Sequence, residues 1–229
     1  METELIISLF TLIALEIVLG IDNVIFISIL SDKLPANQRK KARYLGLGLA
    51  LGLRLVLLAS ISWILKLDKT LVSFGELNFT GKDFILILGG LFLIYKSSKE
   101  IFEKTESHTS SLPNVAGKFN QIIGQILLLD LVFSIDSIIT AIGLVEVLWV
   151  MYAAVIISMI VMLLVATPIS SFVEKHPSIK ILALCFLMMI GLTLIAEGFK
   201  FHIPKGYIYV SMIFSLLVNM IQISKAKIE

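Results

Sequence analysis

Seven long apolar stretches constrain this 229-residue chain more than any other feature of its sequence. A helix needs about 20 mostly apolar residues to cross the hydrocarbon core of a bilayer. Only short connections remain between the stretches, so we expect one all-α polytopic membrane domain over residues 1–229, with about seven transmembrane helices. The stretches lie at roughly 5–30, 44–65, 84–102, 121–145, 149–172, 179–199 and 206–223.

The composition agrees with a chain whose solvent is lipid. Hydrophobic residues make up 58% of it and charged residues 16%, whereas soluble domains have about 25% charged residues. This balance excludes a soluble enzyme, a disordered regulator and a nucleic-acid binder. The net charge of +2 gives no reason to expect a polyanionic partner, and the lone Cys185 cannot form a disulfide within the chain.

The distribution of basic residues predicts the orientation. Most lysines and arginines follow the first, third and fifth stretches or lie in the C-terminal tail. Because cytoplasmic loops carry the excess of Lys and Arg, we expect the N-terminus outside and the C-terminus in the cytosol. The acidic start, with Glu2 and Glu4, lacks the basic region of a signal peptide, so we expect the first stretch to be a retained helix in a multi-pass cell-membrane protein, most simply of a bacterial cytoplasmic membrane.

Two segments of the chain are similar to each other. Residues 15–25 align without a gap to residues 129–139, which places Glu16 on Asp130 and Asp22 on Asp136. We therefore expect repeat 1 at 5–102, a linker at 103–120, repeat 2 at 121–199 and an extra helix at 206–223. Three spans per copy is an odd number, so the second copy must be inverted, as in many secondary transporters.

The repeated acids fall in the middle of apolar stretches, where each would cost about 2.5–3.5 kcal/mol if it faced lipid alone. They must face one another, water, a cation or a proton. At about 100° per residue, Asp22 and Asp136 point about 120° away from the acids six residues upstream. We expect a local break or distortion of the helix at Gly20 and at Ser134, which would turn all the acids toward one central cage.

The predicted cage offers oxygen ligands only. Carboxylate and carbonyl oxygens suit Mn²⁺, Mg²⁺ and Ca²⁺, and no histidine lies within a span. The sequence therefore predicts a site for a hard divalent cation, and no bound cofactor. The predicted metal ligands are Glu16, Asp22, Asn23, Asp130, Asp136 and Ser137, with Thr140 as an accessory oxygen.

Several of these residues also have simpler interpretations. A single buried Asp is as often a hydrogen-bonded core residue as a ligand. Arg54 is either a counter-ion for the cage or a side chain that snorkels to an interface. Glu197, which matches Glu100 in the first copy, is either a gate residue or a solvated helix end. Gly48 and Gly52 form a G-x-x-x-G pattern, which permits close helix packing.

The two acidic strings resemble the signature segments of the TerC family of integral membrane proteins. These strings are Glu16-Ile-Val-Leu-Gly-Ile-Asp22-Asn23 and Asp130-Leu-Val-Phe-Ser-Ile-Asp136-Ser137, and the resemblance extends from about residue 5 to 223. That family is similar to the LysE-type transporter superfamily, and its name comes from tellurium resistance. The resemblance implies a manganese exporter whose metal site lies on the acidic pairs.

The leading hypothesis is a secondary transporter that exports Mn²⁺ or a related divalent cation in exchange for protons. The alternative is a non-transporting membrane partner or scaffold in a metal-resistance, tellurium-resistance or secretion-linked complex. An intramembrane aspartyl protease fits poorly because the Gly-x-Gly-Asp string is absent, so we expect no enzyme. The expected partners are the metal cation, protons and lipid, without nucleic acid; the sequence leaves a homo-oligomer open.

Overall fold

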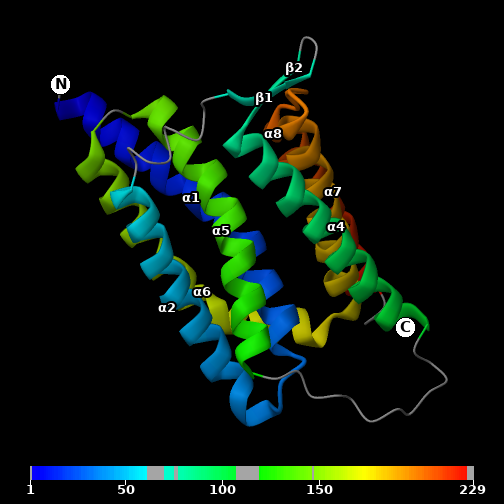
Figure 1. Cartoon of the computed structure of the whole chain (residues 1–229). Coiled ribbons are helices and arrows are strands. Elements are labelled where there is room, and N and C mark those ends of the chain that lie inside the picture. Colours follow the sequence, from blue (N-terminus) through cyan, green and yellow to red (C-terminus); the bar gives the residue numbers. More distant parts are fainter. Residues whose placement is uncertain (1, 61–69, 75–76, 107–118, 146, 226–229) are drawn as a thin grey trace.

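The computed structural model of the chain describes residues 2–60, 70–74, 77–106, 119–145 and 147–225. Within these ranges it contains seven helices and one β-hairpin (Figure 1). The hairpin pairs β1 (Thr70–Phe74) with β2 (Leu77–Thr80) in antiparallel register. The helices are α1 (Glu2–Ser31), α2 (Ala36–Ala59), α4 (Gly81–Glu106), α5 (Phe119–Leu144), α6 (Leu148–Lys175), α7 (Pro177–Gly198) and α8 (Lys205–Lys225).

Each predicted span corresponds to one of these helices. Among the described residues, six helices are long and apolar enough to cross a membrane, and α4 is the one that does not meet this measure. Its sequence carries charges in both halves, with Asp83 in the first turn and Lys96 and Lys99 in the second half. The end of the predicted second span, residues 61–65, and most of the predicted linker fall outside the described residues.

The helices form two groups (Figure 1). One group contains α1, α2, α5 and α6, and the other contains α4, α7 and α8. The most extensive contacts join α4 to α7, α1 to α6 and α2 to α5, whereas the contacts of α8 are mainly with α7. Two clusters of buried apolar side chains fill the space between the helices.

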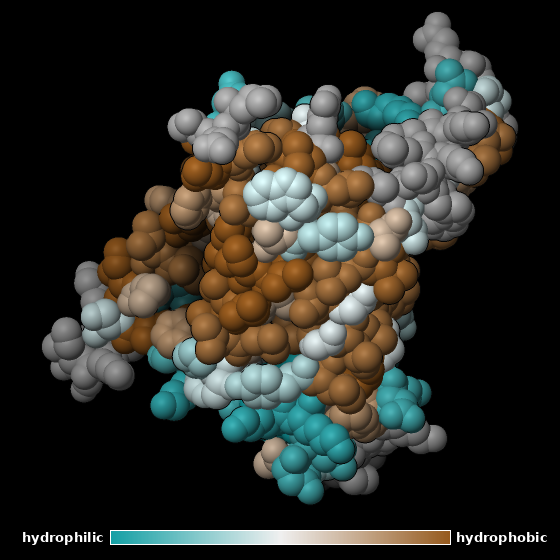
Figure 2. Space-filling model, turned by 90° about the vertical axis from the view of Figure 1, so that its left-hand side faces the viewer, coloured by the Kyte–Doolittle hydropathy of each residue, from teal (hydrophilic) through white to brown (hydrophobic). Residues whose placement is uncertain are grey.

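The surface has the pattern of a membrane protein. Figure 2 shows a broad hydrophobic band between two hydrophilic ends. Large apolar side chains lie exposed on many helices, among them Phe10, Leu88, Leu164 and Phe214. Exposed apolar area on this scale is unfavourable in water but favourable against acyl chains.

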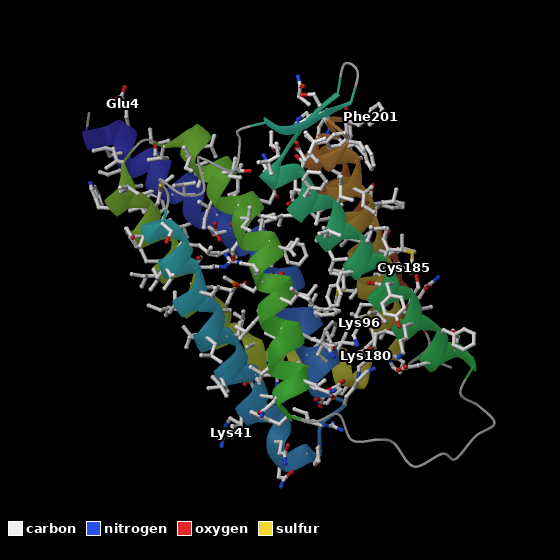
Figure 3. The ribbon with its side chains drawn as sticks, in the orientation of Figure 1. Glu4, Lys41, Lys96, Lys180, Cys185 and Phe201 are labelled. Atoms are coloured by element: carbon white, nitrogen blue, oxygen red, sulfur yellow. The ribbon has the colours of Figure 1, made fainter. Side chains whose placement is uncertain are left out.

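Glu4 and Phe201 lie at one end of the molecule and Lys41 at the other (Figure 3), and we call these the Phe201 end and the Lys41 end.

At the Phe201 end, side chains fix the start of α4 and the end of α7. Thr80 and Asp83 form a reciprocal cap, in which the Thr80 amide donates to Asp83 Oδ2 over 2.6 Å and the Asp83 amide donates to Thr80 Oγ1 over 3.3 Å. Lys200 follows α7 with a left-handed φ of 67° and ends the helix in a Schellman-type turn. Its Nζ lies 2.5 Å from Asp83 Oδ2, which joins the two helix ends.

The middle of the α4–α7 pair is held by backbone contact. A Cβ added to Gly90 would overlap the carbonyl oxygen of Gly191, and one added to Gly191 would lie 2.8 Å from the oxygen of Gly90. Only residues without side chains allow two helix backbones to approach this closely. These two glycines therefore determine the crossing of α4 and α7.

Candidate functional site

Three charged side chains from three helices meet in the middle of the first helix group. Glu16 lies on α1, Arg54 on α2 and Asp130 on α5, and they are only 3%, 3% and 5% exposed. Arg54 Nη1 donates to Glu16 Oε2 over 2.5 Å, and Arg54 Nη2 donates to Asp130 Oδ1 over 3.0 Å. Arg54 Nε also donates to Asp130 Oδ1, over 3.2 Å. We call Glu16, Arg54 and Asp130 the charged triad.

All three nitrogens of the Arg54 guanidinium donate to a carboxylate of the charged triad. The second carboxylate oxygen of Asp130 accepts a hydrogen bond from Ser134 Oγ over 3.1 Å. A planar guanidinium suits this arrangement because its rigid fork of donors can serve two carboxylates at once. Two carboxylates and one guanidinium leave one unit of negative charge. Buried charges are tolerated when they are paired in this way.

A pocket lies beside the charged triad, and Arg54 forms part of its wall. The pocket brings together Asn23 from α1 with Asp136 and Ser137 from α5, all of which are buried. Its volume of about 40 Å³ is room for about three water molecules. The other lining residues are Leu19, Phe133, Ile190, Thr193, Leu194, Ile208 and Tyr209.

The predicted breaks in the two helices are wrong. Helices α1 and α5 run through Gly20 and Ser134 without interruption. Gly20 instead allows α1 to approach Met162 of α6, whose sulfur occupies the space where a Cβ would be. Since α5 is continuous, Asp130 and Asp136 keep the roughly 120° separation of residues six apart. Asp130 accordingly contacts Arg54, whereas Asp136 lines the pocket.

The predicted metal ligands therefore fall into two places. Glu16 and Asp130 belong to the charged triad, and Asn23, Asp136 and Ser137 belong to the pocket. The side chain of Asp22 lies outside the described part of the chain, although its backbone belongs to α1. Among the side chains that the structure describes, no three from His, Cys, Asp and Glu lie close enough together to hold a metal ion.

The accessory residues lie around or away from this pocket. Thr140 does not line it, and its Oγ1 donates to the carbonyl oxygen of Asp136 over 2.9 Å. Glu197 is near the Phe201 end, 4.0 Å from the ring of His202. These contacts place neither Thr140 nor Glu197 in the pocket.

Glu100, the counterpart of Glu197, is buried near the other end of α4. It pairs closely with Lys33, which follows α1, and lies 3.6 Å from Lys96. Burial lowers the pKa of Lys33, but hydrogen bonds and charge from Glu100 and Glu103 outweigh burial, so the net pKa is raised. Lys33 therefore stays charged and joins the turn after α1 to α4.

Two polar residues of the pocket were not predicted from the sequence. Thr193 comes from α7 and Tyr209 from α8, so the second helix group also contributes to the wall. Thr193 Oγ1 donates to the carbonyl oxygen of Ile190 over 2.8 Å, an ordinary contact for a threonine in a helix. A lone Thr or Tyr in an apolar helix gives no signal that separates it from a packing residue, because both occur commonly in membrane spans.

A helical bundle with a hydrophobic band, and with a charged triad and a polar pocket buried within it, defines a polytopic membrane protein with an internal polar site. The sequence model of the integral membrane protein TerC family matches residues 1–228. The chain belongs to this family.

Relatives of known sequence agree with this membership. The UPF0053 inner membrane protein YgdQ of Escherichia coli (strain K12) is 50% identical over 217 residues, which cover 95% of this chain and 92% of YgdQ. The UPF0053 inner membrane protein YoaE of the same strain is 51% identical over 214 residues, 93% of this chain. The matched part is 41% of YoaE, so the chain corresponds to less than half of that protein.

These relatives are named as inner membrane proteins, and the structure has six candidate membrane-spanning helices in its described part. The chain is a multi-pass protein of the cytoplasmic membrane. No solved structure matches it.

Proposed function

We propose that this protein is a secondary transporter that exports a divalent cation, with Mn²⁺ as the favoured substrate. The observation that carries this proposal is the pocket between the two helix groups, which is lined by the carboxylate of Asp136, the amide of Asn23 and the hydroxyl of Ser137. In a bilayer, buried polar side chains that face an internal cavity are typical of ion pathways. We include Asp22 as a predicted ligand because it adjoins Asn23 in α1.

The chemistry of the lining favours a hard cation. Oxygen donors suit Mn²⁺, Mg²⁺ and Ca²⁺, whereas thiolates suit softer metals. The lone Cys185 is exposed, and it does not line the pocket. Neither of the described histidines, His176 and His202, lies at the pocket, since they flank the ends of α7.

The packing of the helices supports two inverted copies of one unit. In two such copies, α1 corresponds to α5, α2 to α6 and α4 to α7. A two-fold axis that relates the copies then turns the α1–α6 contact into the α5–α2 contact. The same axis leaves the α4–α7 contact unchanged, and these are the three most extensive helix contacts. Inverted repeats carry their substrate sites at the repeat interface near the middle of the membrane. We assign α8 as the extra helix and expect the Lys41 end to face the cytosol.

Proton exchange follows from the chemistry of carboxylates. A carboxylate that releases a metal ion can take up a proton, so metal binding and proton binding compete. We propose that Asp136, with Asp22, carries the metal in one direction and protons in the other. The direction, export, rests on the resemblance to manganese exporters.

The test is Mn²⁺ flux into proteoliposomes that contain the purified protein and a metal-quenched dye, with and without a pH gradient. We expect gradient-dependent flux in wild type and at least a tenfold loss in Asp136→Asn and Asp22→Asn. Glu4→Gln is the matched control, because it removes one carboxylate from the exposed start of α1. Wild-type flux in both Asp variants would overturn the proposed site. Folded wild-type protein that moves no divalent cation would favour the partner or scaffold function.

A further inference from the structure

We propose that Arg54 is a tethered cation that offsets the charge of Glu16 and Asp130 while the transporter returns without metal. This inference rests on the proposed function, since it assigns a role within the transport cycle. Its structural basis is the position of Arg54, which hydrogen bonds to both acids of the charged triad and also forms part of the pocket wall. Arg54 is the member of the charged triad that lines this pocket.

The charged triad joins the two copies of the repeat. Glu16 lies on the first helix of repeat 1 and Asp130 at the matching position of repeat 2. Arg54 has no counterpart, because α6 carries no charged residue between Leu148 and Val173. One guanidinium therefore serves two acids that are related by the repeat. If each acid needed only a cation nearby for its own burial, each copy of the repeat could carry its own. The single Arg54 instead couples the two acids to each other.

A guanidinium is suited to a permanent role of this kind. Arg does not lose its proton in proteins, so the cation is always present. Burying a carboxylate without a partner in low dielectric is strongly unfavourable. Without Arg54, Glu16 and Asp130 would form a pair of uncompensated negative charges, and a cation from outside would be needed to offset them. With Arg54 in place, the chain itself supplies one of the two positive charges, and one unit of negative charge remains.

Arg54 also affects the pocket. Its positive charge forms part of the wall that Asp136 shares, and it repels a divalent cation held there. By pairing with Glu16 and Asp130, it also keeps their carboxylates occupied with hydrogen bonds rather than available as ligands. Arg54 is therefore a positioning residue that keeps cation binding weak enough for release and lets the protein reorient without metal.

This role separates two transport modes. Net Mn²⁺ flux requires the transporter to return without metal, whereas exchange of Mn²⁺ on one side for Mn²⁺ on the other uses only the loaded form. Loss of Arg54 should therefore slow net flux and spare exchange. It should also tighten Mn²⁺ binding, since one repelling charge is removed and two carboxylates are released.

The experiment measures net Mn²⁺ flux and radioactive Mn²⁺ exchange in the same proteoliposomes, for wild type and Arg54→Gln. We expect Arg54→Gln to lose at least tenfold in net flux, to keep more than half of the exchange and to bind Mn²⁺ about tenfold more tightly. Arg54→Lys keeps the charge and should recover part of the net flux. Lys41→Gln removes one positive charge from an exposed position of the same helix and should leave both modes unchanged.

A triple variant, Glu16→Gln with Arg54→Gln and Asp130→Asn, keeps the test informative if Arg54→Gln does not fold. It removes all three charges together, so we expect a ratio of net flux to exchange near that of wild type. A triple-variant ratio tenfold below wild type would overturn the role of Arg54, as would equal loss or full retention of both modes in folded Arg54→Gln. If wild type shows neither mode, the proposed function itself fails.

Discussion

The two helix groups are held together internally by opposite means. In the first group, the charged triad joins α1, α2 and α5 through a guanidinium and two carboxylates. In the second group, α4 and α7 meet at Gly90 and Gly191, where the two backbones are in contact. One joint is made by charge and the other by the absence of side chains.

The difference shows how each joint can be broken. The charged triad depends on complementarity, so that removing one member leaves its partners buried and unpaired. The glycine crossing depends on space, so that adding a single methyl group forces the helices apart. The charged joint is therefore sensitive to loss of atoms and the glycine joint to gain of atoms.

The largest effect on stability is expected at the charged triad. Arg54→Gln leaves two buried carboxylates without their cation, which should lower the free energy of unfolding by about 3–5 kcal/mol. The triple variant with Glu16→Gln and Asp130→Asn leaves no buried charge and should stay near wild type. Denaturant unfolding in detergent micelles measures both. A triple variant as unstable as Arg54→Gln would show that geometry, and not charge, holds this joint.

Part of this joint could be predicted from the sequence. Acids in apolar stretches are unfavourable unless they have partners, so Glu16 and Asp130 stand out without any structure. Arg54 stands out for the same reason. The sequence left open whether its side chain points inward as a counter-ion or outward to a membrane interface. The structure directs it inward, to both acids. The predicted helix breaks are wrong, because they assumed that all the acids face one cage. In a continuous helix, Asp130 and Asp136 point in different directions, and the structure gives them different partners.

An intermediate effect is expected at the glycine crossing. Gly90→Ala would place a Cβ against the carbonyl oxygen of Gly191, and backbone cannot move aside as a flexible side chain can. We expect a loss of about 1–3 kcal/mol in the free energy of unfolding. Gly124→Ala in α5 is the matched control, because an added Cβ there meets nothing within 4 Å. Equal stability of the two variants would show that α4 and α7 do not cross this closely.

The sequence did not identify this crossing. The residues around Gly90 and Gly191 read as generic apolar helix, and which glycines touch depends on how two helices far apart in sequence are placed. The same reason explains why Thr193 and Tyr209 were missed, since they reach the pocket only through the packing of α7 and α8 on the first group. Long-range packing of this kind has no local pattern.

The smallest effect is expected at the glycine pattern that the sequence did suggest. Gly48 and Gly52 are exposed on α2, and an added Cβ at either would meet nothing within 4 Å. Within one chain, Gly48→Ala should raise helix stability by no more than about 1 kcal/mol, because alanine is the better helix former. Unfolding and oligomeric state in detergent both test this. A loss of stability, or the disappearance of an oligomer, would show that a second copy packs closely on this face of α2.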